Sequence, residues 1–358
     1  MSVRSKTAAQ QRTDRIEAFN AELAQLAQDN VLTLTPEQRK AVADHHAGLL
    51  AQYSAAYDVD KTRQEKQLSW GMRIVSFLGA LALSASVFFL FYQYWGGFST
   101  AVQVTILIAA AVASFLATVA VSARDRSGYF TKLAALVCFA CFVLNISMLG
   151  QIFNITPSDH ALLLWGALAF LLAYACEMRL LQAAGILCLI AWLAARIGTW
   201  GGVYWVHFGE RPENFLPAAL ALFLLPHLVD HRRYTGFAAT YHVFALLALF
   251  LPILILSNWG YASYLDFEPA MIEGGYQIAG FVLSAAAIAF GLRQGWGEVV
   301  NTGTIFFVIF LYSKFFDWWW EAMPKYLFFL VLGLTAVLCL LILRRLRGLG
   351  EARAEAAP

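Results

Sequence analysis

Charged residues are scarce in this sequence. Asp, Glu, Lys and Arg make up 13% of the 358 residues, whereas hydrophobic residues make up 60%. A soluble globular domain is about 25% charged and about 45–50% apolar, so this composition excludes a soluble enzyme and a disordered chain. The 25 basic and 23 acidic residues leave a net charge of only +2. Because so small a charge creates no overall field that attracts a polyanion, we expect no nucleic-acid partner.

Groups that carry out catalysis or ion coupling are also missing. From Trp70 onward, no long apolar run has Asp, Glu, Lys or Arg near its middle, although ion-coupled carriers usually need such a group. The sequence contains no His-Glu-x-x-His, no Gly-x-Ser-x-Gly and no phosphate-binding glycine loop. We therefore predict no catalytic site and no cofactor, and leave open an enzyme that acts on lipid-linked substrates.

The cysteines give no sign of a disulfide framework. All of them fall inside apolar runs and none falls in an external loop, so disulfides are not expected to hold the fold together. The pair Cys138-x-x-Cys141 has redox spacing, but a thiol in hydrocarbon has a raised pKa and no ready partner. The cysteines are Cys138, Cys141, Cys176, Cys188 and Cys339.

Long hydrophobic runs are what the sequence does contain. Runs of roughly 17–23 apolar residues alternate with short polar breaks, and a helix of that length crosses about 30 Å of hydrocarbon. The sequence therefore predicts an all-α polytopic transmembrane helix bundle of about ten spans over residues 69–345, followed by a disordered tail over residues 346–358. The predicted spans are 71–93, 101–122, 132–152, 160–177, 180–197, 214–229, 238–256, 276–292, 299–315 and 325–343.

The basic residues supply an independent check on this topology. Fifteen Lys and Arg fall on alternate breaks that begin with the N-terminal flank, and only Arg196, Arg211, Lys314 and Lys325 fall on the opposite set. Basic residues are retained on the cytoplasmic side of a membrane. We therefore expect a multi-pass protein of a bacterial cytoplasmic (inner) membrane with both termini in the cytoplasm.

Residues 1–68 differ in composition from the rest and predict a small cytoplasmic helical hairpin with a linker. Ile16, Phe19, Leu23 and Leu26 recur at the spacing of one helical face. The segment Thr35-Pro36-Glu37-Gln38 has the pattern of a helix start, with Thr at the N-cap, Pro at the first position and Gln closing a capping box. A hairpin of this size has a modest core. It fits either a docking module or a plain solvated extension.

Two segments carry a resemblance to a known family. The first is Leu149-Gly150-Gln151-Ile152-Phe153-Asn154-Ile155, followed by Ser158-Asp159 and by Leu162-Leu163-Leu164-Trp165, and the second is Leu34-Thr35-Pro36-Glu37-Gln38. These segments resemble the bacterial membrane-protein family built on domain of unknown function 2157. Phe153 stands where that family more often has Tyr. The resemblance covers about the first 200 residues and implies a membrane topology but no activity, since the family is uncharacterised.

Polar and aromatic residues on the external side suggest a ligand site. Ser147, Gln151 and Asn154 are spaced i, i+4 and i+7 and would form one polar stripe at the external end of the third span. Eight of the eleven tryptophans also fall on that side, Trp200 and Trp259 among them. These five residues are the predicted ligand-binding set. The alternatives are hydrogen bonding between helices for the stripe and an interfacial belt for the tryptophans.

A weaker pattern concerns metal binding. His227, Asp230 and His231 would share one helix face if the sixth span continued through them, and such residues can bind a divalent metal. Arg232 and Arg233 follow at once, and their charge repels a cation. We therefore predict no metal site and an ordinary interfacial loop, with these three residues as weak candidates.

Two functions of different classes remain open. The first is facilitated transport or binding of a neutral or amphipathic small molecule or lipid at an external aromatic cleft, where Gln151 and Asn154 would orient the ligand. The second is a non-transporting membrane scaffold or sensor that recruits a cytoplasmic partner through the N-terminal helices. The expected partners are the lipid bilayer, a small-molecule or lipid ligand, and either a cytoplasmic protein or a second copy of the chain.

Overall fold

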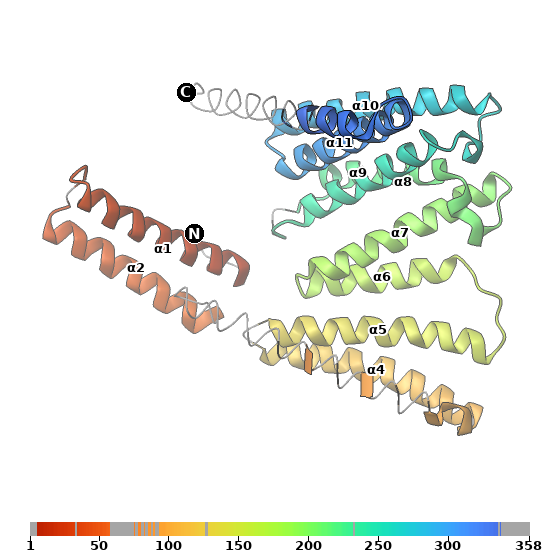
Figure 1. The fold of residues 1–358 in the computed structure, drawn as a ribbon. Coiled ribbons are helices and arrows are strands. Elements are labelled where there is room, and N and C mark those ends of the chain that lie inside the picture. Colours follow the sequence, from red (N-terminus) through yellow and green to blue (C-terminus); the bar gives the residue numbers. More distant parts are fainter. Residues whose placement is uncertain are drawn as a thin grey trace. The chain divides into compact units, whose positions relative to one another are not determined.

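The computed structural model describes residues 6–57 and 93–335 apart from Thr33, Arg126, Ser127 and Arg232, together with isolated positions between residues 75 and 89 and Val337. These residues form helices joined by turns, and no strand occurs in the described part of the chain, which confirms the all-helical prediction (Figure 1). Most of the predicted span 71–93, the end of the span 325–343 and the tail 346–358 lie outside the described residues. The chain divides into two compact units, residues 1–157 with 171–178 and residues 158–170 with 179–358.

The first unit contains a helical hairpin built from α1 (Lys6–Gln28) and α2 (Pro36–Tyr57). Its core is small: Ala9, Ile16 and Tyr53 are buried, and Leu49 packs against Ala9 and Tyr53. The capping box is formed at the start of α2. The Thr35 hydroxyl accepts the backbone N–H of Gln38 at 3.3 Å, and the Gln38 side chain accepts the N–H of Thr35 at 3.1 Å. Both interactions satisfy N–H groups that the helix itself leaves unpaired.

The first unit also contains a pair of long apolar helices, α4 (Thr100–Arg124) and α5 (Tyr129–Ile152), which pack against each other and follow the short helix η1 (Trp95–Gly97). At about 1.5 Å per residue each is roughly 36 Å long, enough to cross about 30 Å of hydrocarbon. Asp125 ends α4, and its carboxylate accepts both the backbone N–H and the hydroxyl of Thr131 at 2.8 and 3.1 Å. That carboxylate anchors the first turn of α5.

The second unit is organised around α9. It begins with part of α6 (His160–Ala175) and continues with α7 (Arg179–Trp200), the short helices η2 (Trp205–Glu210) and η3 (Pro212–Phe215), and α8 (Leu216–Leu228). It ends with α9 (Phe237–Leu256), η4 (Gly260–Ala262), α10 (Pro269–Gln294), α11 (Gly297–Trp319) and the helix Lys325–Thr335. The central helix α9 packs against α7, α8, α10 and α11.

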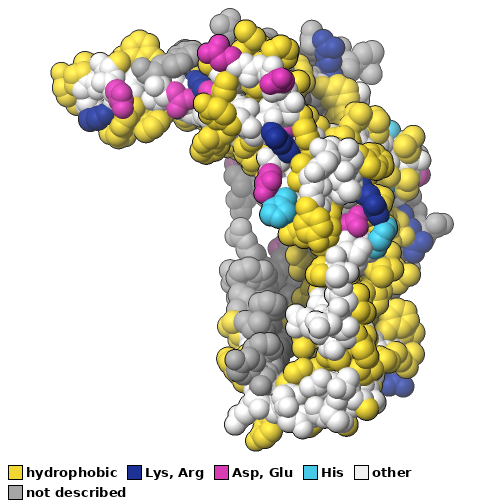
Figure 2. All heavy atoms as spheres, turned by 90° about the vertical axis from the view of Figure 1, so that its right-hand side faces the viewer, with side chains coloured by type: hydrophobic (Ala, Val, Ile, Leu, Met, Phe, Trp, Pro, Cys, Tyr) yellow, Lys and Arg dark blue, Asp and Glu magenta, His cyan; other side chains and the backbone are white. Residues whose placement is uncertain are grey.

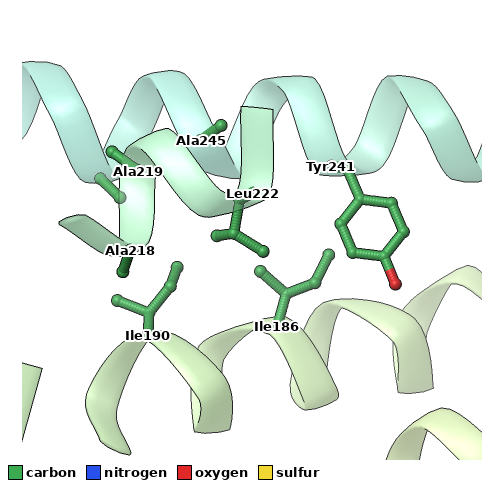
Figure 3. Packing of buried hydrophobic residues seen from close by; sticks show 8 residues of the cluster. Ile186, Ile190, Ala218, Ala219, Leu222, Tyr241 and Ala245 are labelled. Atoms are coloured by element: carbon green, nitrogen blue, oxygen red, sulfur yellow. The ribbon is translucent and has the colours of Figure 1, made fainter. Parts of the chain in front are cut away.

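Two apolar clusters hold α9 in place. Figure 3 shows the first, in which Ile186 and Ile190 of α7 point toward Leu222 of α8 and toward Tyr241 and other residues of α9. The second cluster joins α9 to α11 and includes stacked rings of Phe250 and Phe306, whose centroids lie 4.9 Å apart.

In the second cluster α10 approaches α11 closely at Gly280. A Cβ atom there would lie 2.7 Å from the ring of Phe310, so only glycine leaves room for that ring. α10 and α11 are therefore tightly packed at this point.

Six helices in the described part of the chain are long and apolar enough to cross a membrane, namely α4, α5, α7, α9, α10 and α11. Each corresponds to one predicted span. The helices His160–Ala175 and Lys325–Thr335 are apolar but shorter. The predicted span 214–229 contains only the 13 residues of α8, which extend about 20 Å, less than the thickness of the hydrocarbon layer. Figure 2 shows hydrophobic side chains over much of one face, with scattered charged groups between them.

Candidate functional site

Two loops at one end of the second unit are held together by polar contacts, most of them partly buried. The loop between α7 and α8 contributes Arg211, Glu213 and Asn214, and the loop between α9 and α10 contributes Ser263 and Tyr264. Oε1 of Glu213 accepts the hydroxyl of Ser263 and the backbone N–H of Tyr264, the latter at 3.1 Å. A third donor is the Tyr276 hydroxyl, at 3.4 Å. The carboxylate thus fixes the loop that leaves α9.

The neighbours of Glu213 strengthen this connection. The guanidinium of Arg211 donates to the carbonyl groups of Tyr261 and Ser263 and lies 5.2 Å from the ring centroid of Tyr264. Asn214 is fully buried, donates to the carbonyl of Phe208 at 2.9 Å and accepts the hydroxyl of Tyr264 at 3.1 Å. These contacts give the α9–α10 loop one defined conformation next to a cavity.

The cavity lies where the C-terminal ends of α9 and α11 meet the N-terminal part of α10, and its volume is about 620 Å³. We call it the α9–α11 cavity. Leu254, Ile255 and Ile309 form its apolar side, and the remaining lining residues are polar, charged or aromatic. These are Asn258, Trp259, Glu273, Ser313, Lys314 and Asp317. The cavity therefore has the two-sided character that suits an amphipathic guest.

Hydrogen bonds orient the polar side of the cavity. The side-chain amide of Asn258 donates to the Leu254 carbonyl at 2.8 Å, and its oxygen accepts the Ser313 hydroxyl at 3.3 Å. Lys314 forms an ion pair with Asp317 at 2.9 Å. Asn258 and Ser313 thus link the last residues of α9 to α11 directly beneath the opening.

Glu273 and Trp259 complete the opposite wall. Oε1 of Glu273 accepts the backbone N–H of Gly260 at 3.0 Å, which ties α10 to the turn after α9. Gly260 is required there because a Cβ atom would lie 2.5 Å from the carbonyl oxygen of Pro269. Trp259, the residue before it, is 64% exposed. The indole is therefore presented at the cavity while the backbone beside it is held firmly.

The predicted ligand-binding residues do not form one group. Trp259 lines the α9–α11 cavity, whereas Trp200, the last residue of α7, is 81% exposed and is not part of the lining. Ser147, Gln151 and Asn154 belong to the first unit. The Ser147 hydroxyl donates to the Val143 carbonyl at 2.9 Å.

The predicted polar stripe is wrong at Asn154. α5 ends at Ile152, and Asn154 adopts a left-handed conformation with φ of 52°. The N–H of Ile155 bonds to the carbonyl of Gly150 at 2.9 Å across it, which is the pattern of a helix-terminating Schellman motif. Asn tolerates this conformation better than other non-glycine residues. Asn154 therefore stops the helix rather than extending its polar face.

The shared helix face proposed for the weak metal candidates is also wrong. α8 ends at Leu228, so His227 is helical whereas Asp230 and His231 lie beyond the helix end. His231 bonds through Nδ1 to the Val229 carbonyl at 2.7 Å. Within the described residues, no group of three His, Cys, Asp or Glu side chains is placed to hold a metal ion.

A separate buried pair joins the first turn of α11 to α9. Nδ1 of His242 lies 3.1 Å from a carboxylate oxygen of Glu298, and the imidazole stacks on Trp296 with ring centroids 4.2 Å apart. His227 lies against the same indole at 5.4 Å. This contact set packs α8, α9 and α11 together at the end of α9 away from the cavity.

Sequence reasoning missed most of the cavity. From the sequence, Lys314 and Asp317 fit an ion pair on an exposed helix surface. Asn258 fits a loop residue and Glu273 a residue at a helix end. The available signal was that the predicted spans 238–256 and 299–315 both end on the external side at polar residues, with Asn258 just after the first span and Ser313 near the end of the second. Helices that alternate in direction bring such ends to the same side of a membrane.

The comparisons support the membrane assignment. The family model described as "Predicted membrane protein (DUF2157)" matches residues 41–182, which confirms the resemblance found in the sequence. The matched segment ends within α7, so the helices that form the α9–α11 cavity lie beyond it. No curated protein and no solved structure matches the chain.

Proposed function

We propose that this membrane protein binds an amphipathic small molecule or lipid in the α9–α11 cavity and facilitates its transport across the membrane. The observation that supports the proposal is the cavity itself, about 620 Å³ in volume and lined by apolar residues on one side and polar residues on the other. Binding sites for small molecules typically have about 300–1,000 Å³ and combine apolar walls with a few placed polar groups.

The apolar and polar lining residues would contact different parts of a ligand. Leu254, Ile255 and Ile309 would contact a hydrocarbon segment, and each buried methylene stabilises a complex by about 0.8 kcal/mol. Asn258 and Ser313 would lie beside the polar end. The fixed loop conformation reduces the ordering that binding would otherwise require.

The distribution of basic residues supports an external position for this cavity. Lys314 is among the four basic residues on the sparsely basic set of breaks, which the positive-inside rule assigns to the outside. The proposal accordingly puts both termini in the cytoplasm of a bacterial cell and the cavity opening toward the periplasm.

The test uses 6-bromohexan-1-ol, a neutral amphipathic probe whose bromine quenches tryptophan fluorescence on contact. The purified protein in dodecyl maltoside micelles is titrated with the probe. We expect saturable quenching in the unmodified protein and in Trp200→Phe, and its loss in Trp259→Phe and in Ile309→Trp, which fills the cavity. Quenching that never saturates, or that is lost in Trp200→Phe but kept in Trp259→Phe, would contradict the site.

The second candidate function is recruitment of a cytoplasmic protein through the N-terminal hairpin. It is favoured by the small core of α1 and α2 and by Phe19, which is 48% exposed although it is apolar. A chain without residues 1–57 separates the two functions. Retained saturable quenching together with a retained cellular phenotype supports the cavity. Retained quenching with a lost phenotype supports the scaffold.

A further inference from the structure

The charges that line the α9–α11 cavity do not cancel. Lys314 is neutralised by Asp317 at 2.9 Å. Glu273, the other carboxylate in the lining, bonds to the backbone N–H of Gly260 and has no ion-pair partner in the part of the chain that the structure describes. The lining therefore holds one negative charge that no cation among the described residues compensates.

The indole of Trp259 lies at the same place. Glu273 bonds to the N–H of Gly260, the residue directly after Trp259, so its carboxylate is fixed beside the turn that presents the indole. Both side chains line the cavity. The face of an indole attracts cations through its quadrupole, and the attraction is strongest for ligand ammonium groups that shed water easily.

We propose that the ligand of this cavity is a cationic amphiphile whose ammonium group sits between Trp259 and Glu273. This inference rests on the proposed function and names the chemistry of the ligand's polar end. The hydrocarbon part of such a ligand lies along Leu254, Ile255 and Ile309. An anionic head group is disfavoured because Lys314, the cation in the lining, is already paired and Glu273 repels it.

The experiment compares three probes that share one bromohexyl chain and differ in head group: 6-bromohexyltrimethylammonium, 6-bromohexan-1-ol and 6-bromohexane-1-sulfonate. Each is titrated against the full chain in non-ionic dodecyl maltoside micelles, and tryptophan quenching is recorded. We expect the ammonium probe to bind about tenfold more tightly than the alcohol and the sulfonate to bind most weakly. A tenfold difference corresponds to about 1.4 kcal/mol.

Two variants assign the preference to Glu273. In Glu273→Gln the side-chain oxygen can still accept the Gly260 N–H, so the fold is kept while the charge is removed. We expect the preference for the ammonium probe to fall well below tenfold in this variant, because only the attraction of the Trp259 indole remains. Glu268→Gln is the matched control, because Glu268 is the exposed N-cap residue of α10, the helix that carries Glu273, and lies outside the cavity lining, and it should keep the tenfold preference.

The outcomes distinguish this inference from the proposed function. Equal binding of the alcohol and ammonium probes to the unmodified protein overturns the cationic ligand and leaves the cavity as a binding site. Absence of saturable quenching by all three probes overturns both. Where the ammonium preference is found, adding lysyl-phosphatidylglycerol, a lipid whose head group carries a net positive charge, to the micelles identifies its source: competition assigns the site to a lipid head group, and lack of competition assigns it to a free alkylammonium compound.

Discussion

Replacing Glu213 with Gln should destabilise the second unit, because this one carboxylate accepts two hydrogen bonds from the α9–α10 loop and one from Tyr276 of α10. A hydrogen bond to a charged group contributes about 1.5–3 kcal/mol and one between neutral groups about 0.5–1.5 kcal/mol. Glutamine keeps an acceptor oxygen, so each of the two shorter bonds loses about 1 kcal/mol. The bond from Tyr276, at 3.4 Å, contributes less. We expect a total loss of about 2 kcal/mol.

A matched control exists in the same segment. Glu210 also forms a charged contact, with Nδ1 of His207 at 2.6 Å, but its side chain is 65% exposed. Exposed ion pairs contribute about 0–1 kcal/mol because solvent screens them. Glu210→Gln should therefore leave stability nearly unchanged although it makes the same chemical substitution.

The assay is thermal unfolding followed by tryptophan fluorescence in dodecyl maltoside micelles. A change of 1 kcal/mol moves the Tm of a unit of this size by about 2–4 °C, so Glu213→Gln should unfold about 4–8 °C below the unmodified protein. Unfolding of the two variants within 1 °C of each other would contradict a stabilising role for the Glu213 hydrogen bonds.

Five further substitutions, at four positions, test the packing and the turns. Phe250→Ala removes a fully buried ring and should lower stability by about 3–5 kcal/mol in the same assay, whereas the exposed neighbour Leu251→Ala should change it by less than about 1 kcal/mol; equal effects would contradict the assigned core. Asn154→Ala should lower stability by about 1 kcal/mol while Asn154→Gly should not, since φ is positive there; a loss in both variants would favour a role for the side chain. Gly260→Ala should abolish quenching by 6-bromohexan-1-ol, because its Cβ would clash with the Pro269 carbonyl and displace the turn, and normal binding would show that the turn does not shape the cavity.

The length and composition of the apolar runs were enough to predict most of the long helices. The runs at 101–122, 132–152, 180–197 and 238–256 correspond to α4, α5, α7 and α9. A membrane span must pair its backbone N–H and C=O groups by hydrogen bonds within one helix, and its side chains are either buried or in contact with lipid. Helix ends were predicted less well. Asn154 and Asp230 were predicted to continue the helical spacing of the preceding span. The helices end before them, at Ile152 and Leu228.

The site could not be assembled from the sequence for a related reason. Trp259, Glu273 and Ser313 come from three different helices or their ends. Apolar periodicity says which residues face away from water but not which helices are neighbours, since lipid and protein interiors are equally apolar. Trp259 was predicted because it is one of the tryptophans that fall on the external side. Glu273 was not, because an acidic residue at the start of a helix is equally typical of favourable interaction with the helix dipole.

The most direct test of an externally open binding cavity is the reactivity of a cysteine placed at Ser313, in a chain whose own cysteines are replaced. Intact cells are treated with a membrane-impermeant maleimide, with and without hexyltrimethylammonium, which has the same head group but no bromine to react with the thiol. We expect labelling from outside the cell that hexyltrimethylammonium slows. Labelling that appears only after the cells are lysed would contradict it.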